Sequence, residues 1–289
     1  MYRAGFLLYI LLQHRLVLLY RWRSRKWQFD TLFGLFYGAG MFWGLLSILP
    51  MSYFGSLHLL FLGFQLNSFL ACAYFMLPRF SRMVREKLRG GLWMGITAFL
   101  LVNLAVLFNL LGFLIRAHFP MLGRWIADVQ ALSMSVYLLQ VAAIFLMSGL
   151  LLYILGVGKF VIKALKVASF AHVFSVMYFL LGAYYSMFVA MGNYGFKGLH
   201  QHLMISGMML FAMSMGYYWY MLNFSLSGSS DWKVFALAIT FLLLVPVSDL
   251  ALIPFAILLI VWFFLEISRN RIMLLNDTIS VLKEIGRIF

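Results

Sequence analysis

Charged residues are scarce in this chain, and acidic residues are the scarcest. Only 10% of the 289 residues are charged, with 8 Asp and Glu against 22 Lys and Arg. The single cysteine, Cys72, lies within an apolar run, which excludes a disulfide framework or a cysteine-based metal site within this chain. The sequence also lacks a phosphate-binding glycine loop with lysine, a His-Glu-x-x-His zinc helix and a Ser-His-Asp set. These absences argue against hydrolytic chemistry.

Apolar residues dominate instead. They make up 65% of the sequence, against roughly 45–50% in soluble domains. A helix that crosses a hydrocarbon core of about 30 Å needs roughly 20 apolar residues. Runs of this kind predict spans at about 31–50, 53–77, 91–115, 131–155, 167–190 and 199–223. The sequence therefore predicts an all-α fold, a polytopic transmembrane helical bundle that forms a single domain over residues 1–289.

The segment 234–266 is too long for one upright span, because a continuous helix of this length would measure about 50 Å. We expect two short helices that break around Pro246, Asp249 and Pro254, which gives about eight spans. A single seventh span is the alternative. Asp249 could serve as a proton or ion relay, although breaking the hairpin is its simpler role.

Clusters of Lys and Arg fix the expected orientation. They precede the first span and follow the second and fourth, and cytoplasmic loops are the ones enriched in these residues. We expect an integral protein of a prokaryotic cytoplasmic membrane, with both termini in the cytoplasm. Residues 1–30 should form a cytoplasmic interfacial segment, with a first span over 4–20 as the alternative, residues 31–266 the helical bundle, and residues 267–289 a cytoplasmic amphipathic tail. The net charge of +14 then reflects topology rather than nucleic-acid binding.

Three histidines are expected at one depth. His58 lies about five residues into the second span, and His200 and His202 open the sixth, which runs in the same direction. Neutral imidazoles at one depth on two helices suit axial ligation of a haem iron. His200 and His202 point about 200° apart around their helix, so they could serve two cofactors but not one iron. The alternative is that they cap the helix or form hydrogen bonds at the interface.

Two segments around these histidines resemble a known family. The run HQHLMISGMMLFAMSMGYYW, starting at His200, resembles the helix of haem–copper oxidase subunit I that carries a His-x-His pair before a Gly- and Met-rich stretch. The run LHLLFLGFQLNSFLACAYFMLPR, starting at Leu57, resembles that family's second helix. The chain is also similar to the NnrS-like membrane proteins, which are associated with haem, copper and nitric oxide stress.

The resemblance implies that His58 and His202 ligate a low-spin haem b, and that His200 faces a second haem. Haem propionates favour cationic partners. Three cations of the predicted outer loops would lie at this level: Arg116, Arg124 and Lys197. Ordinary loop cations are an equally good account of these three residues.

The chain departs from the oxidase pattern in its remaining histidines. It has no His-His pair, and only His14, His118 and His172 are left for copper, at positions that do not converge on the expected haem level. We therefore expect neither a complete copper site nor oxygen reduction by this chain alone.

The expected function is that of a membrane haem-binding protein. It would transfer electrons or bind a diatomic gas such as O2 or NO, in contact with membrane lipid and other membrane redox subunits and without nucleic acid. Whether it belongs to an oxidoreductase as a non-autonomous enzyme subunit stays open. The alternative is a cofactor-free membrane anchor, assembly subunit or transporter, in which the histidines pair polar groups between helices.

Overall fold

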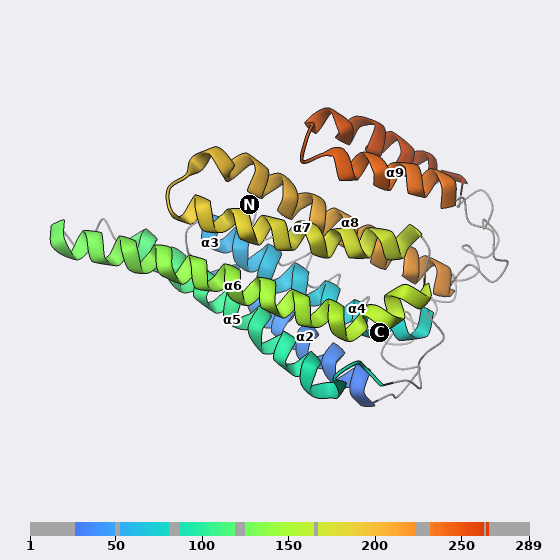
Figure 1. Ribbon diagram of the computed structural model, residues 1–289, viewed down its shortest axis with the longest axis horizontal. Helices are drawn as coiled ribbons and strands as arrows, with labels where there is room; N and C mark the ends of the chain where they lie inside the picture. Colours follow the sequence, from blue (N-terminus) through green and yellow to red (C-terminus); the bar gives the residue numbers. More distant parts are fainter. Residues whose placement is uncertain are drawn as a thin grey trace, which may run out of the picture.

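The computed structural model describes residues 27–49, 53–80, 87–118, 125–164, 167–223, 232–262 and 264–265. Within these ranges the chain is helical and contains no strand, which confirms the predicted all-α class. The helices lie side by side in one elongated bundle (Figure 1). The main elements are α2 (Trp27–Leu46), α3 (Tyr53–His58), the π-helix η1 (Leu59–Leu66), α4 (Asn67–Phe80), α5 (Gly91–His118), α6 (Trp125–Ala164), α7 (Val167–Ala190), the 3-10 turn η3 (Tyr194–Phe196), α8 (Lys197–Asn223), α9 (Trp232–Leu244) and the 3-10 turn η4 (Asp249–Ala251).

Five of the helical segments are long and apolar enough to cross a membrane. They are Gln28–Leu46, Gly55–Pro78, Gly91–Arg116, Leu132–Val161 and Ala168–Ala190. α8 is long enough at 27 residues but is not among the five. Its polar histidine, glutamine and tyrosine residues lower its hydropathy. The described residues thus provide five clear candidate spans rather than the eight that the sequence predicted.

The predicted break in segment 234–266 is present. α9 ends at Leu244, the chain turns through η4, and a second short helix runs over Leu252–Trp262. The first of these helices has 13 residues and the second has 11, which corresponds to about 20 Å and about 17 Å. Each described length is below the roughly 30 Å of a hydrocarbon core, and neither helix is among the five candidate spans of the described residues.

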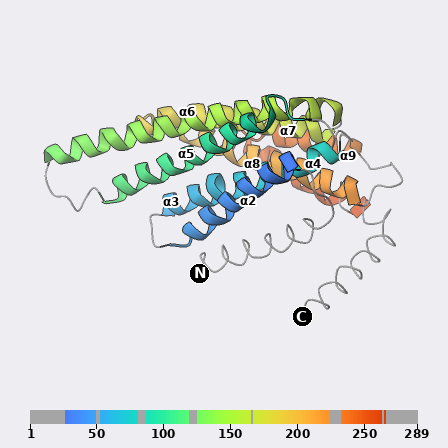
Figure 2. The same cartoon turned by 90° about the horizontal axis from the view of Figure 1, so that it is seen from below.

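α6 is longer than predicted. It has 40 residues, or about 60 Å, and begins at Trp125 instead of near residue 131. Its first turns extend past the neighbouring helices (Figure 2). The sequence predicts a loop before position 131, where charged residues occur, but a helix can continue beyond the apolar layer. The region between the predicted spans 91–115 and 131–155 is therefore partly helical.

α5 and α6 share the most extensive contact of any two described helices, and glycine allows their backbones to approach each other closely. A Cβ on Gly149 of α6 would lie 3.1 Å from the Val102 backbone nitrogen and 3.2 Å from the Ala98 carbonyl oxygen. Near the other end of the pair, the Ser135 hydroxyl donates to the Gly112 carbonyl at 2.9 Å. Small residues that bring backbones together are typical of helix pairs in membranes.

Candidate functional site

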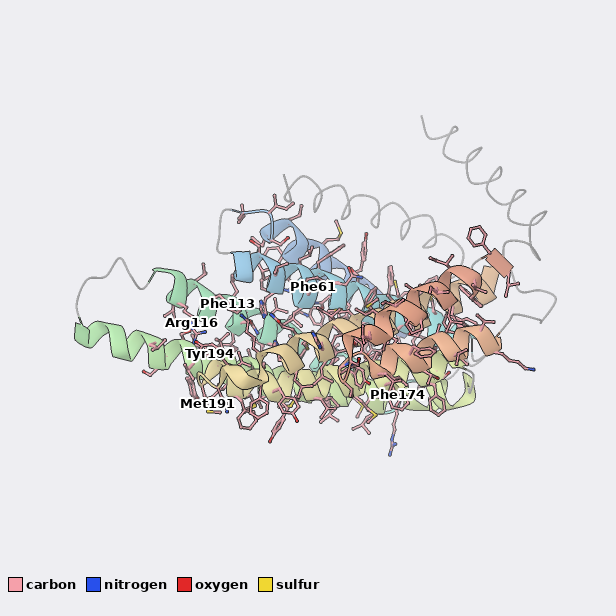
Figure 3. The ribbon with its side chains drawn as sticks, turned by 90° about the horizontal axis from the view of Figure 1, so that it is seen from above. Phe61, Phe113, Arg116, Phe174, Met191 and Tyr194 are labelled. Carbon is pink, nitrogen blue, oxygen red and sulfur yellow. The ribbon has the colours of Figure 1, made fainter. Side chains whose placement is uncertain are left out.

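His58 and the start of α8 lie at the same end of the bundle. The His58 ring packs against Phe113, 4.6 Å between centroids, near the end of α5. The Arg116 guanidinium, one turn further along α5, donates to the Ala190 carbonyl at the end of α7, at 3.5 Å. α8 begins only a few residues after Ala190. Figure 3 shows Phe113, Arg116, Met191 and Tyr194 together at this end, which we call the histidine end, with Phe174 far from it.

The second and sixth predicted spans run in parallel from the histidine end. α4 and α8 meet where Phe69 stacks on Phe211, with 5.4 Å between ring centroids. His58 precedes Phe69 by 11 residues, eight of which form the π-helix η1, and His202 precedes Phe211 by 9. Because a π-helix rises less per residue than the 1.5 Å of an α-helix, the first separation is at most about 16 Å and the second is about 14 Å. The two histidines are thus at nearly the same height. Within the described residues, α3 and η1 make at most sparse contact with α8, so the α4–α8 interface weakens toward the histidines.

His200 faces α7. Its Nδ1 lies 2.8 Å from the Gly182 carbonyl oxygen. Because a carbonyl can only accept, Nδ1 carries the proton and Nε2 keeps its lone pair. Gly182 permits the close approach, since a Cβ there would lie 2.7 Å from the Met204 sulfur. His202 lies about 200° away around α8, next to the exposed Gln201 and Ile205.

The three predicted cations have different positions. Arg116 lies in the last turns of α5 rather than in a loop, and its bond to Ala190 places a positive charge at the C-terminus of α7, where it is favourable. Lys197 is the exposed first residue of α8. Arg124 lies outside the described residues. Only Arg116 and Lys197 are therefore seen at the histidine end.

Three buried polar atoms without partners among the described residues lie within about a turn of His58, Phe113 or His202 along their helices. They are the Ser56 hydroxyl in α3, the Asn109 Oδ1 one turn before Phe113 in α5, and the Ser206 hydroxyl one turn after His202 in α8, whereas others, such as the Ser68 hydroxyl in α4, lie elsewhere. Other buried serines donate to a carbonyl three residues earlier in their own helix: Ser47, Ser175 and Ser214. A buried polar atom without a partner costs about 1–3 kcal/mol. The histidine end can therefore offer hydrogen bonds to a ligand.

The π-helix η1 follows His58 directly and depends on a polar network. Asn67 at its end donates from Nδ2 to the Gly63 carbonyl at 2.7 Å. The Asn67 Oδ1 accepts from the Asn103 Nδ2 at 3.1 Å, and the Asn103 Oδ1 accepts from the Trp43 indole at 2.7 Å. The network joins α2, α4 and α5 at the boundary between η1 and α4, where the backbone changes from the π-helical to the α-helical hydrogen-bond pattern. π-helical segments occur often at functional sites.

A second polar pair lies far from the histidine end. His172 is fully buried near the start of α7, and its Nε2 lies 2.9 Å from the Tyr153 hydroxyl of α6. Its Nδ1 has no partner among the described residues. Sequence reasoning placed His172 away from the haem level, which agrees with this position, but it could not pair His172 with Tyr153. His14 and the side chain of His118 lie outside what the structure describes.

The donors at the histidine end fit haem ligation in chemical type, since imidazole nitrogens and unpaired polar atoms lie at one height on neighbouring helices. No group of three or more His, Cys, Asp or Glu that could hold a metal ion occurs among the described residues. Comparisons with protein-family models, curated proteins and solved structures found no match.

Proposed function

We propose that the chain is an integral membrane protein that binds a low-spin haem b between α3 and α8, with His58 and His202 as axial ligands. The observation that supports this most is the set of unpaired buried atoms of Ser56, Asn109 and Ser206 around two histidines of equal height. A planar cofactor would lie between α3 and α8, which run in parallel and make at most sparse contact near these residues. The haem would supply reversible one-electron chemistry and, with a ligand position open, gas binding.

The protein's own residues would position the group. The hydroxyl of Ser206, one turn from His202, and the amide of Asn109 offer hydrogen bonds to its polar edge. Arg116 and Lys197, and Arg124 if it lies at the same end, would pair with propionates. His200 donates from Nδ1 to the Gly182 carbonyl, which leaves the lone pair of Nε2 for a metal. His200 is therefore the candidate ligand of a second haem.

We place the protein in a prokaryotic cytoplasmic membrane with both termini in the cytoplasm, where it would transfer electrons or bind O2 or NO beside other redox subunits. The family proposed for it is that of haem–copper oxidase subunit I or the NnrS-like proteins. One observation favours a cofactor-free anchor or assembly subunit instead. The Gly182 carbonyl already satisfies His200, as expected for a histidine that only joins two helices.

A reduced-minus-oxidised optical spectrum of the purified full chain tests the proposal. We expect low-spin haem bands that are lost in His58→Ala and in His202→Ala. Gln201→Ala is the matched control, because Gln201 is exposed beside His202 on the same helix turn and should leave the spectrum unchanged. A correctly folded wild type without a Soret band after expression with haem supplied would refute haem binding and favour the anchor.

A further inference from the structure

The tip of the hairpin formed by α9 and residues 252–262 lies halfway along the bundle. The Tyr178 hydroxyl of α7 donates to the Leu243 carbonyl at the end of α9, at 2.5 Å. Tyr178 lies 10 residues after the start of the candidate span Ala168–Ala190 and 12 before its end, or about 15 Å and about 18 Å. If α7 crosses the membrane, the tip therefore lies near the bilayer centre.

Both ends of the hairpin lie at the end of the bundle where α7 begins. The Phe235 ring at the start of α9 packs on Tyr217 near the end of α8, with 4.7 Å between centroids, and on Trp262 at the end of the second short helix, with 5.0 Å. Figure 1 shows the same arrangement, with the hairpin turning back partway along α7 and α8. The hairpin thus enters and leaves the bundle at one end, where the Lys and Arg clusters predict the cytoplasm.

Polar side chains occur at this tip, whereas the two helices that lead to it are apolar. From residue 234 to residue 261 the only polar side chains are those of Thr240, Ser248 and Asp249. Thr240 donates to the Ala236 carbonyl of its own helix at 3.0 Å, whereas Ser248 is exposed. Asp249 follows Ser248 as the first residue of η4. The sequence therefore places a hydroxyl and a carboxylate where the hairpin is deepest.

The backbone of the tip also offers oxygen atoms. The amides of Val247 and Ser248 both donate to the Leu244 carbonyl, at 2.9 and 3.0 Å. Within the described residues, no backbone N–H donates to the carbonyls of Pro246 and Val247. Irregular backbone at membrane depth is tolerated where protein or a water-filled cavity covers it, not where it faces lipid. Because hydrocarbon cannot satisfy these oxygens, the tip requires a polar environment.

We propose that the hairpin tip is a water-accessible site for a small hard cation near the bilayer centre, reached from the end of the bundle where α7 begins. The donors are oxygens, namely the carbonyls of Pro246 and Val247 and the Ser248 hydroxyl, and Asp249 adds a negative charge beside them. Hard cations prefer oxygen ligands, and half-helix ends with unwound backbone supply them within membranes. This inference rests on the membrane placement proposed above and does not depend on haem.

Reaction of single cysteines with charged, membrane-impermeant methanethiosulfonate reagents in native membranes tests this site. The native cysteine is first removed by Cys72→Ala, and Ser248→Cys then replaces the exposed hydroxyl with a thiol. The matched control is Ile144→Cys, 47% exposed and 12 residues into the candidate span Leu132–Val161, because a thiol there should face lipid at a similar depth. We expect the cationic reagent to modify Ser248→Cys at least about tenfold faster than Ile144→Cys.

The ratio of the rates of the cationic and the anionic reagent tests attraction of cations separately from access to water. Relative to free cysteine in solution, this ratio should be about tenfold higher at Ser248→Cys and should fall when Asp249→Asn is added. Ionisation of the thiol affects both reagents equally, so the ratio reports the local electrostatic potential. Na+ is the probe for binding, and Val247→Cys reports it because this variant keeps the Ser248 hydroxyl. Replacing choline chloride by sodium chloride at equal ionic strength should slow its modification.

Equal modification rates at Ser248→Cys and Ile144→Cys would overturn the water-accessible site, and fast modification of both would overturn the membrane placement as well. An unchanged ratio in Asp249→Asn, or an unchanged rate at Val247→Cys in Na+, would overturn cation binding. Val247 is 86% exposed, so Val247→Cys also repeats the access measurement at a second position of the tip. Loss of the haem spectrum would leave these results unchanged, so the two proposals fail separately.

Discussion

Replacing Asn103 by leucine should destabilise the fold, because this side chain connects three helices. Its Oδ1 accepts from the Trp43 indole at 2.7 Å and its Nδ2 donates to the Asn67 Oδ1 at 3.1 Å. Leucine has a similar size but leaves the indole N–H and the Asn67 oxygen without partners. Interhelical hydrogen bonds in membranes contribute about 0.6 kcal/mol each on average and about 1.7 at most, so we expect a loss of about 1–3 kcal/mol.

Reversible unfolding in mixed micelles with rising SDS measures this free energy. The matched control is Thr97→Val, on the same helix, because the exposed Thr97 hydroxyl donates only to the Trp93 carbonyl of its own helix and its removal should be nearly neutral. A double-mutant cycle of Asn103→Leu with Asn67→Leu should give less than additive losses, since both remove the same bond. The reasoning is refuted if Asn103→Leu costs no more than Thr97→Val.

Two further substitutions test the packing. Gly63→Ala should lower the free energy of unfolding by about 1–3 kcal/mol, because the new Cβ would lie 2.5 Å from the Trp43 Cβ, whereas Gly38→Ala, with open space around it, should be neutral in the same SDS assay. Tyr178→Phe removes the hydroxyl that satisfies the Leu243 carbonyl and should loosen the hairpin by about 1 kcal/mol. Faster amide exchange at the hairpin tip, with unchanged exchange in α5, would confirm it, and equal exchange would contradict it.

The helix positions followed from the sequence because charges and turns bound the apolar runs. The predicted span 167–190 coincides with α7, and 91–115 ends three residues before α5 does. The predicted boundary was wrong where a helix continues into polar sequence, as at the start of α6. Hydropathy also does not predict how far the hairpin of α9 and residues 252–262 extends along the bundle. That position depends on contacts between helices, such as the one between Tyr178 and Leu243.

The candidate site was predictable only in part. Position along two helices placed His58 and His202 at one height, and the Phe69–Phe211 contact, which joins the same two helices, agrees with this placement. The π-helix after His58 has no signal in the sequence, since it depends on the bond of Asn67 to another helix. The sequence of neither helix predicts the contact between Tyr153 of α6 and His172 of α7, because it depends on how the two helices pack.

The distribution of unpaired polar atoms separates the two proposed functions better than the histidines do. A core that only anchors a partner gains nothing from buried polar atoms without partners, and the network around Asn103 satisfies its amide groups, whereas the Ser68 hydroxyl beside Asn67 has no partner. Three unpaired atoms, on Ser56, Asn109 and Ser206, nevertheless lie within a turn or so of His58, its partner ring and His202. At about 1–3 kcal/mol each, they are costly in the single chain. A ligand that accepts or donates hydrogen bonds at this end would remove that cost, which a purely structural role leaves unexplained.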